Sequence, residues 1–268
     1  MNILFIGAGK MATAIASGIK NNKHLSEKIK IKAVDPSSDA CAAFKSASGY
    51  ECFTEASDSL LSEAETVILA VKPQVAEAAS LPLAGKISGK LIVSIAAGLK
   101  LETLKEWFKS ERIIRLMPNT PLLVGCGASA YSCAEGVSGD DEELINDIFK
   151  SMGILHRVTE DLMDTVTALS GSGPAYIFEL VQAMCDAAVK LGLPEDTALG
   201  LTVQTVSGAA EMLKQGAGTP DELRKAVTSP GGTTEAGLAV LEKNNFRGLI
   251  CEMIKSAHAR SVELGKKK

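Results

Sequence analysis

Short apolar runs alternate with segments of helical pattern along the first 158 residues. The runs of strand length cover residues 3–6, 31–34, 66–71, 91–95 and 113–117. This alternation predicts a parallel sheet whose strands are joined by crossover helices. Several runs are apolar almost throughout, which is typical of strands covered on both faces. We therefore expect residues 1–158 to form a doubly wound α/β domain.

The pattern changes near residue 160, where apolar residues begin to recur at helical spacing. Three sets show it: Ile177, Leu180, Val181, Met184, Ala188 and Leu191; Leu199, Val203, Val206, Ala210 and Leu213; Leu249, Ile250, Met253, Ile254 and Ala257. The segments are rich in alanine and glycine, which suits close packing, including packing against a second subunit. The sequence predicts an all-helical domain over residues 159–268.

Composition excludes several classes of function. The hydrophobic fraction of 46% and charged fraction of 22% are those of a globular protein, and a net charge of -4 gives no field that would gather nucleic acid or an acidic membrane. No stretch approaches the roughly 20 apolar residues that span a bilayer. We find no secretory leader, so we expect a soluble, cytoplasmic protein.

Six cysteines lie far apart, without a CxxC pair or a histidine at metal-ligand spacing: Cys41, Cys52, Cys126, Cys133, Cys185 and Cys251. We interpret them as free thiols and expect no metal site.

The first candidate site is the turn after the first strand. Gly7, Gly9 and Ala12 match the G-x-G-x-x-G/A fingerprint between a strand and a helical stretch. The first glycine permits the tight turn, the second lets the backbone approach a pyrophosphate, and the small third residue keeps the helix close to the sheet. The alternative is an ordinary glycine turn, but the position and flanking strand favour a dinucleotide site.

An acidic residue follows the second strand, where dinucleotide-binding domains hold the ribose. Asp35 could accept a hydrogen bond from the ribose 2′-OH of NAD and would repel a 2′-phosphate. It could equally serve a local Asx-type turn. The loops at residues 70–74 and 94–98 also follow strands, at the sheet edge where open α/β sheets bind ligands.

A second glycine-rich loop lies in the helical half. Thr219 and Glu222 form a capping box, with Pro220 at the first helical position. The short helix that follows ends near Val227, and residues 228–234 then lead into another helix. The backbone N–H groups and hydroxyls of this loop could hold an anion, and a carboxylate fits because the dinucleotide has its own loop. An ordinary interhelical turn is the alternative. Residues 170–174 also contain two glycines and are interpreted as a flexible break between helices.

The histidines give a hint about the reaction. His24, His156 and His258 lie outside every motif. Reduction of a carbonyl usually needs a proton donor such as histidine, lysine or tyrosine, whereas the nitrogen of an imine can be protonated separately. The absence of histidine from the motifs therefore favours reduction of a C=N bond over reduction of a C=O bond.

Five motifs together closely resemble the pyrroline-5-carboxylate reductase family. They are Gly7 to Ala12, Ala70 to Gln74, Arg115 to Pro121, Ala168 to Tyr176 and Val227 to Thr234, in the family's order over nearly the whole chain. The resemblance implies a Rossmann-type doubly wound domain, an all-helical dimerisation domain, and active sites completed between two subunits. It further implies reduction of 1-pyrroline-5-carboxylate to proline, with hydride from NAD(P)H.

The resemblance also implies roles for individual residues. Ser229, Gly231, Gly232, Thr233 and Thr234 would hold the substrate carboxylate, and Thr234 would also hydrogen-bond the ring nitrogen as the candidate catalytic proton donor. The cofactor would contact Ile6, Gly7, Ala8, Gly9, Lys10, Met11, Asp35, Ser57, Ala70, Val71, Lys72 and Pro73, with Ala97, Met117, Pro118 and Asn119 nearer the nicotinamide.

Two positions depart from the family. Ser57 stands where many members have asparagine near the adenosine, and Asp35 stands where a small polar residue is common. The family most often uses NADPH, whereas Asp35 favours NADH, so the expectation is NAD(P)H.

Two other functions remain open. One is a 3-hydroxyacid-type dehydrogenase with Lys72 or Lys190 as the acid, although Lys190 stands where a lysine commonly complements a helix dipole. The other is a non-catalytic nucleotide-binding regulatory protein, which would not need the loop 229–234.

Overall fold

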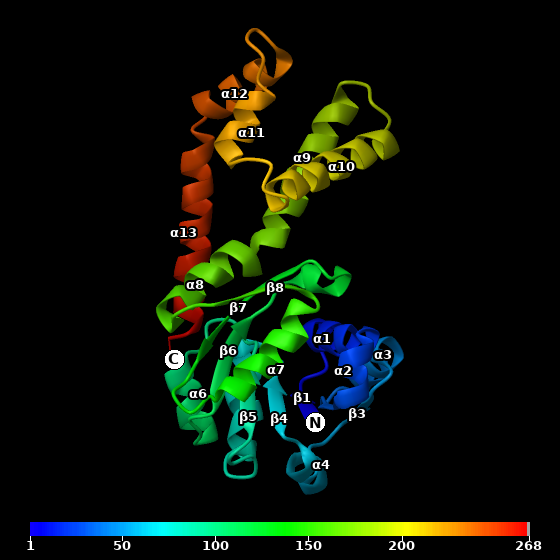
Figure 1. The fold of residues 1–268 in the computed structure, drawn as a ribbon, viewed down its shortest axis with the longest axis vertical. Helices are drawn as coiled ribbons and strands as arrows, with labels where there is room; N and C mark the ends of the chain where they lie inside the picture. Colours follow the sequence, from blue (N-terminus) through cyan, green and yellow to red (C-terminus); the bar gives the residue numbers. More distant parts are fainter. Residues whose placement is uncertain (267–268) are drawn as a thin grey trace. The chain divides into compact units, whose positions relative to one another are not determined.

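One mixed sheet of eight strands organises the described part of the N-terminal half (Figure 1). The strands are β1 (Asn2–Ile6), β2 (Lys30–Val34), β3 (Glu51–Phe53), β4 (Thr66–Leu69), β5 (Leu91–Ser94), β6 (Ile113–Met117), β7 (Gly127–Cys133) and β8 (Gly153–Arg157). Their order is β3-β2-β1-β4-β5-β6-β7-β8. All neighbours are parallel except β6 and β7. The order reverses between β1 and β4, which is where doubly wound sheets bind ligands.

The computed structural model describes residues 1–266 and contains two compact units. The first comprises Met1–Pro174 and the chain from Ser256 onward, and the second comprises Ala175–Lys255.

Helices cover both faces of the sheet in the first unit. They are α1 (Lys10–Asn21), α2 (Lys23–Lys28), α3 (Ser38–Ser48), α4 (Asp58–Glu63), α5 (Pro73–Ser80), α6 (Leu101–Phe108), α7 (Gly139–Lys150) and α8 (Met163–Val166), with single 3₁₀ turns η1 (Leu81–Leu83), η2 (Thr120–Val124) and η3 (Glu160–Leu162). Two apolar cores result. One contains Phe5, Phe44 and Phe149, and the other contains Leu69, Leu104 and Phe108. The predicted doubly wound α/β fold is confirmed.

The five apolar runs predicted as strands correspond to β1, β2, β4, β5 and β6. The apolar pattern did not locate the other three strands, β3, β7 and β8. β3 has only three residues, and β7 and β8 contain small and polar residues such as Gly127, Ser129 and His156. These strands form through pairing with a neighbour, which a single segment does not reveal.

The segment around residues 170–174, interpreted from its glycines as a flexible break between helices, contains the end of one helical turn and the start of the next helix. The chain forms a π-helical turn, η4 (Thr167–Gly171), between α8 and α9 (Gly173–Lys190). The N–H of Ser172 donates to the carbonyl of Thr167 at 2.9 Å. This bond pairs the backbone N–H at Ser172, between Gly171 and Gly173.

The second unit is helical. It contains most of α9, α10 (Glu195–Lys214), α11 (Pro220–Ala226), α12 (Thr233–Lys243) and the first part of α13 (Phe246–Leu264). The predicted capping box is confirmed, because Thr219 accepts from the Glu222 N–H while the Glu222 carboxylate accepts from the Thr219 N–H.

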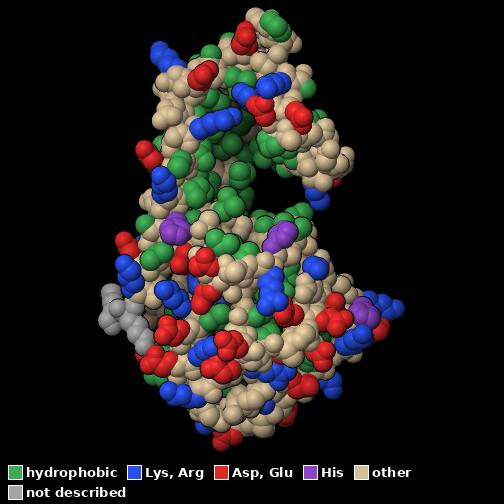
Figure 2. All heavy atoms as spheres, turned by 60° about the vertical axis from the view of Figure 1, so that its left-hand side comes forward, with side chains coloured by type: hydrophobic (Ala, Val, Ile, Leu, Met, Phe, Trp, Pro, Cys, Tyr) green, Lys and Arg blue, Asp and Glu red, His purple; other side chains and the backbone are tan. Residues whose placement is uncertain are grey.

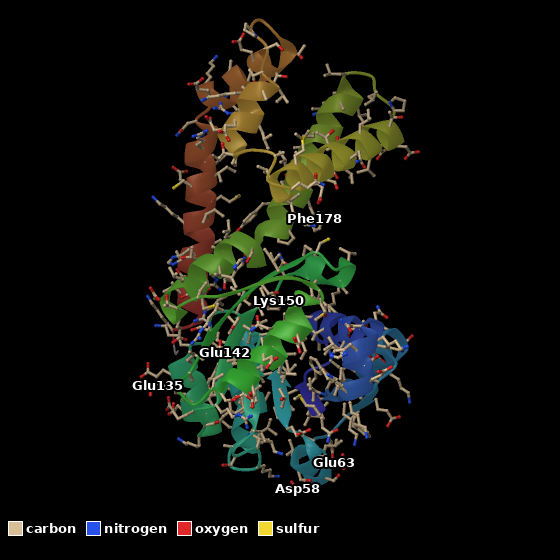
Figure 3. All side chains as sticks on the ribbon, in the orientation of Figure 1. Asp58, Glu63, Glu135, Glu142, Lys150 and Phe178 are labelled. Atoms are coloured by element: carbon tan, nitrogen blue, oxygen red, sulfur yellow. The ribbon has the colours of Figure 1, made fainter. Side chains whose placement is uncertain are left out.

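Few side chains of the second unit are buried within the chain. Among its residues only Cys185, Ala198 and Thr202 are buried. By contrast, 17 of the 25 exposed large apolar side chains belong to it, including Phe178, Leu191 and Leu249. Figure 2 shows hydrophobic side chains on the open surface of these helices, and Figure 3 marks Phe178 on α9. The unit therefore presents apolar faces that a single chain leaves uncovered.

Within the described residues, the helices are all too short or too polar to cross a membrane.

Candidate dinucleotide site and substrate loop

The turn after β1 requires glycine at its first position. Gly7 has a φ of +100°, and a Cβ there would lie 2.6 Å from the Ala70 carbonyl oxygen. The Gly7 N–H donates to the Val34 carbonyl at 2.7 Å, so the turn is also tied to the end of β2. Gly7 therefore serves the fold directly, because a side chain there would strike β4's end.

Gly9 is different, because no atom of residues 1–266 occupies the space beside it. It has φ −72° and ψ −178°, which any residue adopts, and a Cβ there would meet no atom within 4 Å. Gly9 precedes α1, whose first N–H groups and dipole attract an anion. Ala12 is fully buried, as a close approach between helix and sheet requires. The turn can accept a pyrophosphate.

Asp35 is bonded to the same turn. Its Oδ2 accepts from the Ala8 N–H at 2.9 Å, and its Oδ1 accepts from the Ser37 N–H at 3.0 Å. The Asx-type turn considered from the sequence is present, with an additional bond to Ala8. Each carboxylate oxygen has a further lone pair, so Asp35 can also accept from a ribose hydroxyl.

A cleft of about 710 Å³ opens beside the glycine turn. It is lined by predicted cofactor residues, namely Ile6, Gly7, Gly9, Asp35, Ala70, Val71 and Lys72. Its other lining residues are Val34, Pro36, Thr54, Ala56, Val75, Ala78, Ala79, Pro82 and Leu83. The sequence reasoning missed the residues from Thr54 onward. Thr54 and Ala56 follow β3, the short strand that was not located, and the remaining residues lie on α5 and η1.

Other predicted cofactor residues have structural partners or lie outside this cleft. Lys10 and Met11 begin α1, and Pro73 begins α5. The Ser57 hydroxyl caps α4 by accepting from the Leu60 N–H at 3.3 Å.

The carboxyl end of β6 is held to the π-helical turn. The buried Asn119 side chain donates to the Ser170 carbonyl at 3.0 Å and accepts from the Ala128 N–H at 2.9 Å. A Cβ at Gly171 would lie 2.5 Å from Cε of Met117. Two motifs about fifty residues apart thus meet at the end expected to face the nicotinamide. Asn119 there holds the backbone, and Pro118 is buried beside it.

A buried charge cluster lies under these loops. Arg115, 3% exposed, pairs with Asp164 at 3.0 Å and Glu160 at 3.5 Å. Asp164 also accepts from the Ser261 hydroxyl at 2.8 Å, and Glu160 accepts from the Leu101 N–H. The cluster therefore connects β6, the start of α6 and the last turns of α13.

The loop that carries Ala97 packs against the end of α13. Gly98 has a φ of +79°, and a Cβ there would lie 3.0 Å from the Ser261 carbonyl oxygen. Because both backbones approach closely, the C-terminal turns of the chain fix this cofactor-side loop.

The predicted substrate loop precedes α12 in the second unit. Gly231 has a φ of +70°, and its N–H donates to a carboxylate oxygen of Glu235 at 2.7 Å. The Gly232 N–H donates to the Ser229 carbonyl at 3.0 Å. Thr233 and Thr234 are the first two residues of α12, where N–H groups have no partner within the helix. The Gly231 and Gly232 N–H groups are therefore paired within the loop in this structure, and the N–H groups of Thr233 and Thr234 are the donors without a helical partner.

Fold and site together define a class. A doubly wound sheet, a glycine turn with open space at Gly9 and an acidic residue after β2 are the features of a Rossmann-type dinucleotide-binding protein.

Comparisons with known proteins identify the family. The model described as pyrroline-5-carboxylate reductase dimerisation matches residues 160–264, and the model described as NADP oxidoreductase, coenzyme F420-dependent, matches residues 2–98. A pyrroline-5-carboxylate reductase of Arabidopsis thaliana is 42% identical, covering 97% of this chain and 94% of the relative. One of Pseudomonas aeruginosa is 40% identical, covering 98% and 96%.

A solved structure agrees with this result. The Plasmodium falciparum pyrroline carboxylate reductase with NADP bound has a TM-score of 0.88 and 33% identity, covering 99% of this chain and 98% of the other. The chain belongs to the pyrroline-5-carboxylate reductase family.

Proposed function

We propose that this protein reduces 1-pyrroline-5-carboxylate to L-proline with NAD(P)H, the last step of proline biosynthesis. The observation that carries the proposal is the combination of two loops in a chain of this family. One loop precedes α1 beside an open cleft, and the other precedes α12, where the first N–H groups, at Thr233 and Thr234, have no partner within the helix. The first fits a pyrophosphate, and the second fits the carboxylate of the substrate.

The dinucleotide fits the residues of the cleft. The open space at Gly9 and the N-terminus of α1 would hold the pyrophosphate, and Asp35 would face the ribose near Ala8. Val71, Lys72 and Val75 would line the cofactor from the other side. The remaining predicted cofactor residues, Ala97, Met117, Pro118 and Asn119, would border the nicotinamide.

The chemistry needs a hydride on the imine carbon and a proton on the imine nitrogen. Bound NAD(P)H supplies the hydride. The loop 229–234 would hold the substrate carboxylate so that the imine carbon is fixed, and the Thr234 hydroxyl would hydrogen-bond the ring nitrogen. A threonine hydroxyl is a weak acid, so we propose positioning with partial proton donation, while water can protonate the cyclic imine.

The proposal divides the chain into a dinucleotide-binding part, 1–158, and a substrate-binding and dimerisation part, 159–268. The uncovered apolar faces of the second unit support a homodimer or a larger assembly of dimers. As the resemblance to the family implies, each active site would be completed between two subunits. The proposed location is the cytoplasm, and the proposed partners are a small-molecule substrate and further copies of the chain, without nucleic acid or membrane.

The rival dehydrogenase reaction has less support. Lys190 lies in the last turn of α9, where a lysine complements the helix dipole. Lys72 lines the dinucleotide cleft, where we assign it to the cofactor and not to acid catalysis.

Product analysis tests the proposed function. Purified protein given 1-pyrroline-5-carboxylate and NADPH or NADH should form proline in equal amount to the coenzyme oxidised. Gly9→Val protein is the matched control, because that change should remove the dinucleotide site alone. Coenzyme oxidation without proline would contradict the proposal.

A further inference from the structure

Two cysteines lie side by side next to the proposed ribose site. Cys41 is on α3 and Cys52 is on β3, and their Sγ atoms are 2.8 Å apart. Both are free thiols in this structure. A disulfide bond is about 2.05 Å long, so the two sulfur atoms need to approach each other by less than about 1 Å to form one. Among residues 1–266, this is the one hydrogen-bonding contact between two cysteine sulfurs.

The thiol pair is connected to the dinucleotide turn by hydrogen bonds. The single S–H of Cys41 is shared between the carbonyls of Asp35, at 3.2 Å from Sγ, and Phe53, at 3.4 Å. Asp35 in turn accepts from the Ala8 N–H through its side chain. A change at Cys41 therefore reaches Asp35 directly and the glycine turn through one further bond.

Protonation permits the close approach. Burial, together with the hydrogen bond to Cys41, raises the pKa of the Cys52 thiol to about 12. Cys52 is therefore uncharged near neutral pH, and no repulsion between two thiolates opposes the contact. Because a thiolate is the attacking species, the pair should react slowly at neutral pH and faster in alkaline buffer.

We propose that Cys41 and Cys52 form a reversible disulfide, a modification site that weakens coenzyme binding when oxidised. With oxidised glutathione, Cys52 attacks one glutathione sulfur and releases one reduced glutathione. Cys41 then attacks the mixed disulfide at Cys52 and releases the second. Two protein thiols are oxidised, one glutathione disulfide is reduced, and the two thiol protons pass to the released thiolates or to water.

The disulfide has a consequence for the cleft. The bonded Cys41 sulfur carries no proton, so the Asp35 carbonyl loses this donor, whereas the Phe53 carbonyl keeps its bond from the Asp35 N–H at 3.0 Å. The bond also draws α3 toward β3. Asp35 and Thr54, which lie beside these two elements in the sequence, line the cleft on the proposed ribose side. We expect this displacement of the cleft wall to cost about one net hydrogen bond between the wall and the coenzyme, which corresponds to an increase of about fivefold in the Kd of NADPH.

The experiment uses a background protein in which the exposed Cys126 and Cys251 are serines. This protein is incubated with oxidised glutathione at pH 8.5, where the thiolate fraction is larger, and is then alkylated and digested for mass spectrometry. NADPH binding is measured by fluorescence titration before oxidation, after it, and after reduction with dithiothreitol. Direct binding makes the test independent of the proposed reaction, because NADPH binding by the reduced protein first establishes the site.

We expect a Cys41–Cys52 cross-linked peptide and a higher Kd that dithiothreitol restores. Cys41→Ser and Cys52→Ser, each made in the same background, should keep the Kd constant under oxidation. A Cys133→Ser variant is the matched control and should respond like the background protein. Absence of the cross-link while glutathione modifies Cys126 of the unsubstituted protein would overturn the proposal, and so would a cross-link that leaves the Kd unchanged.

Discussion

The two glycines of the dinucleotide turn have separate duties, although the fingerprint lists them alike. Gly7 is required by its positive φ and by the Ala70 carbonyl, whereas the space beside Gly9 is open. Gly9→Val should therefore leave thermal unfolding nearly unchanged and nearly abolish coenzyme binding, because the side chain would occupy the pyrophosphate position. Gly7→Ala should instead lower stability. Calorimetry with NADPH titration checks both, and unchanged coenzyme affinity in folded Gly9→Val would refute the site.

Asp35 has a structural role in the turn, and we propose a selective one toward the coenzyme. Removing its charge relieves repulsion of a 2′-phosphate, so Asp35→Ser should shift the ratio of kcat/KM for NADH and NADPH toward NADPH. About fivefold is expected for a charge interaction of about 1 kcal/mol at a partly exposed site. Asp35→Asn keeps one carbonyl acceptor for a backbone N–H and removes only the charge, so it should shift the ratio similarly. An unchanged ratio in both variants would leave Asp35 as a turn residue only.

Thr234 is the candidate closest to the chemistry. If its hydroxyl acts as general acid, Thr234→Ala should lower kcat by about 10²-fold or more. A positioning bond worth about 1 kcal/mol would cost only about fivefold. For positioning with partial donation, we expect an intermediate loss that shrinks as pH falls and the imine becomes protonated in water, with Thr234→Ser retaining most activity. A loss that is constant with pH would exclude this compensation, and no loss at any pH would remove Thr234 from the mechanism.

At the scale of elements, the sheet shows which features a sequence reveals. Five apolar runs located β1, β2, β4, β5 and β6, because strands buried on both faces are apolar throughout. The strands β7 and β8 depend on pairing between segments about 25 residues apart, with Gly127 opposite Gly153. The same limit applies to the site. Asn119 was expected beside the cofactor, but its bonds to Ser170 and Ala128 come from tertiary contacts that no motif records.

The Arg115 cluster connects three elements beneath the nicotinamide side. Arg115→Met would leave Asp164 and Glu160 facing one another without a cation, and loss of one partner from a buried pair costs about 3–5 kcal/mol. Ser261→Ala removes one hydroxyl bond to Asp164 and should cost only about 1 kcal/mol. Denaturant unfolding of both variants measures the difference. Equal losses in the two variants would contradict the central position of Arg115.

At the scale of the whole molecule, the helices of the second half were predicted correctly. Their apolar side chains, however, are not all buried within a single chain. The periodic apolar positions lie on α9, α10 and α13 or, for Leu191, directly after α9, and many remain exposed, with Leu191 at 90% and Leu249 at 61%. Such faces predict an obligate oligomer. Light scattering should give at least a dimer at working concentrations. Phe178→Glu, which places a charge on one of these faces, should weaken assembly, whereas Glu63→Gln on α4 should not. A fully active monomer would rule out a shared site.

The most direct test of the central claim is a comparison of substrates under one set of conditions. The kcat/KM for 1-pyrroline-5-carboxylate with NADPH and NADH is measured beside oxidation of 3-hydroxyacids with NADP⁺ and NAD⁺. Efficient reduction of the imine to proline with no turnover of hydroxyacids is the predicted result. Hydroxyacid oxidation without imine reduction, or coenzyme binding with no turnover of either, would contradict the assignment.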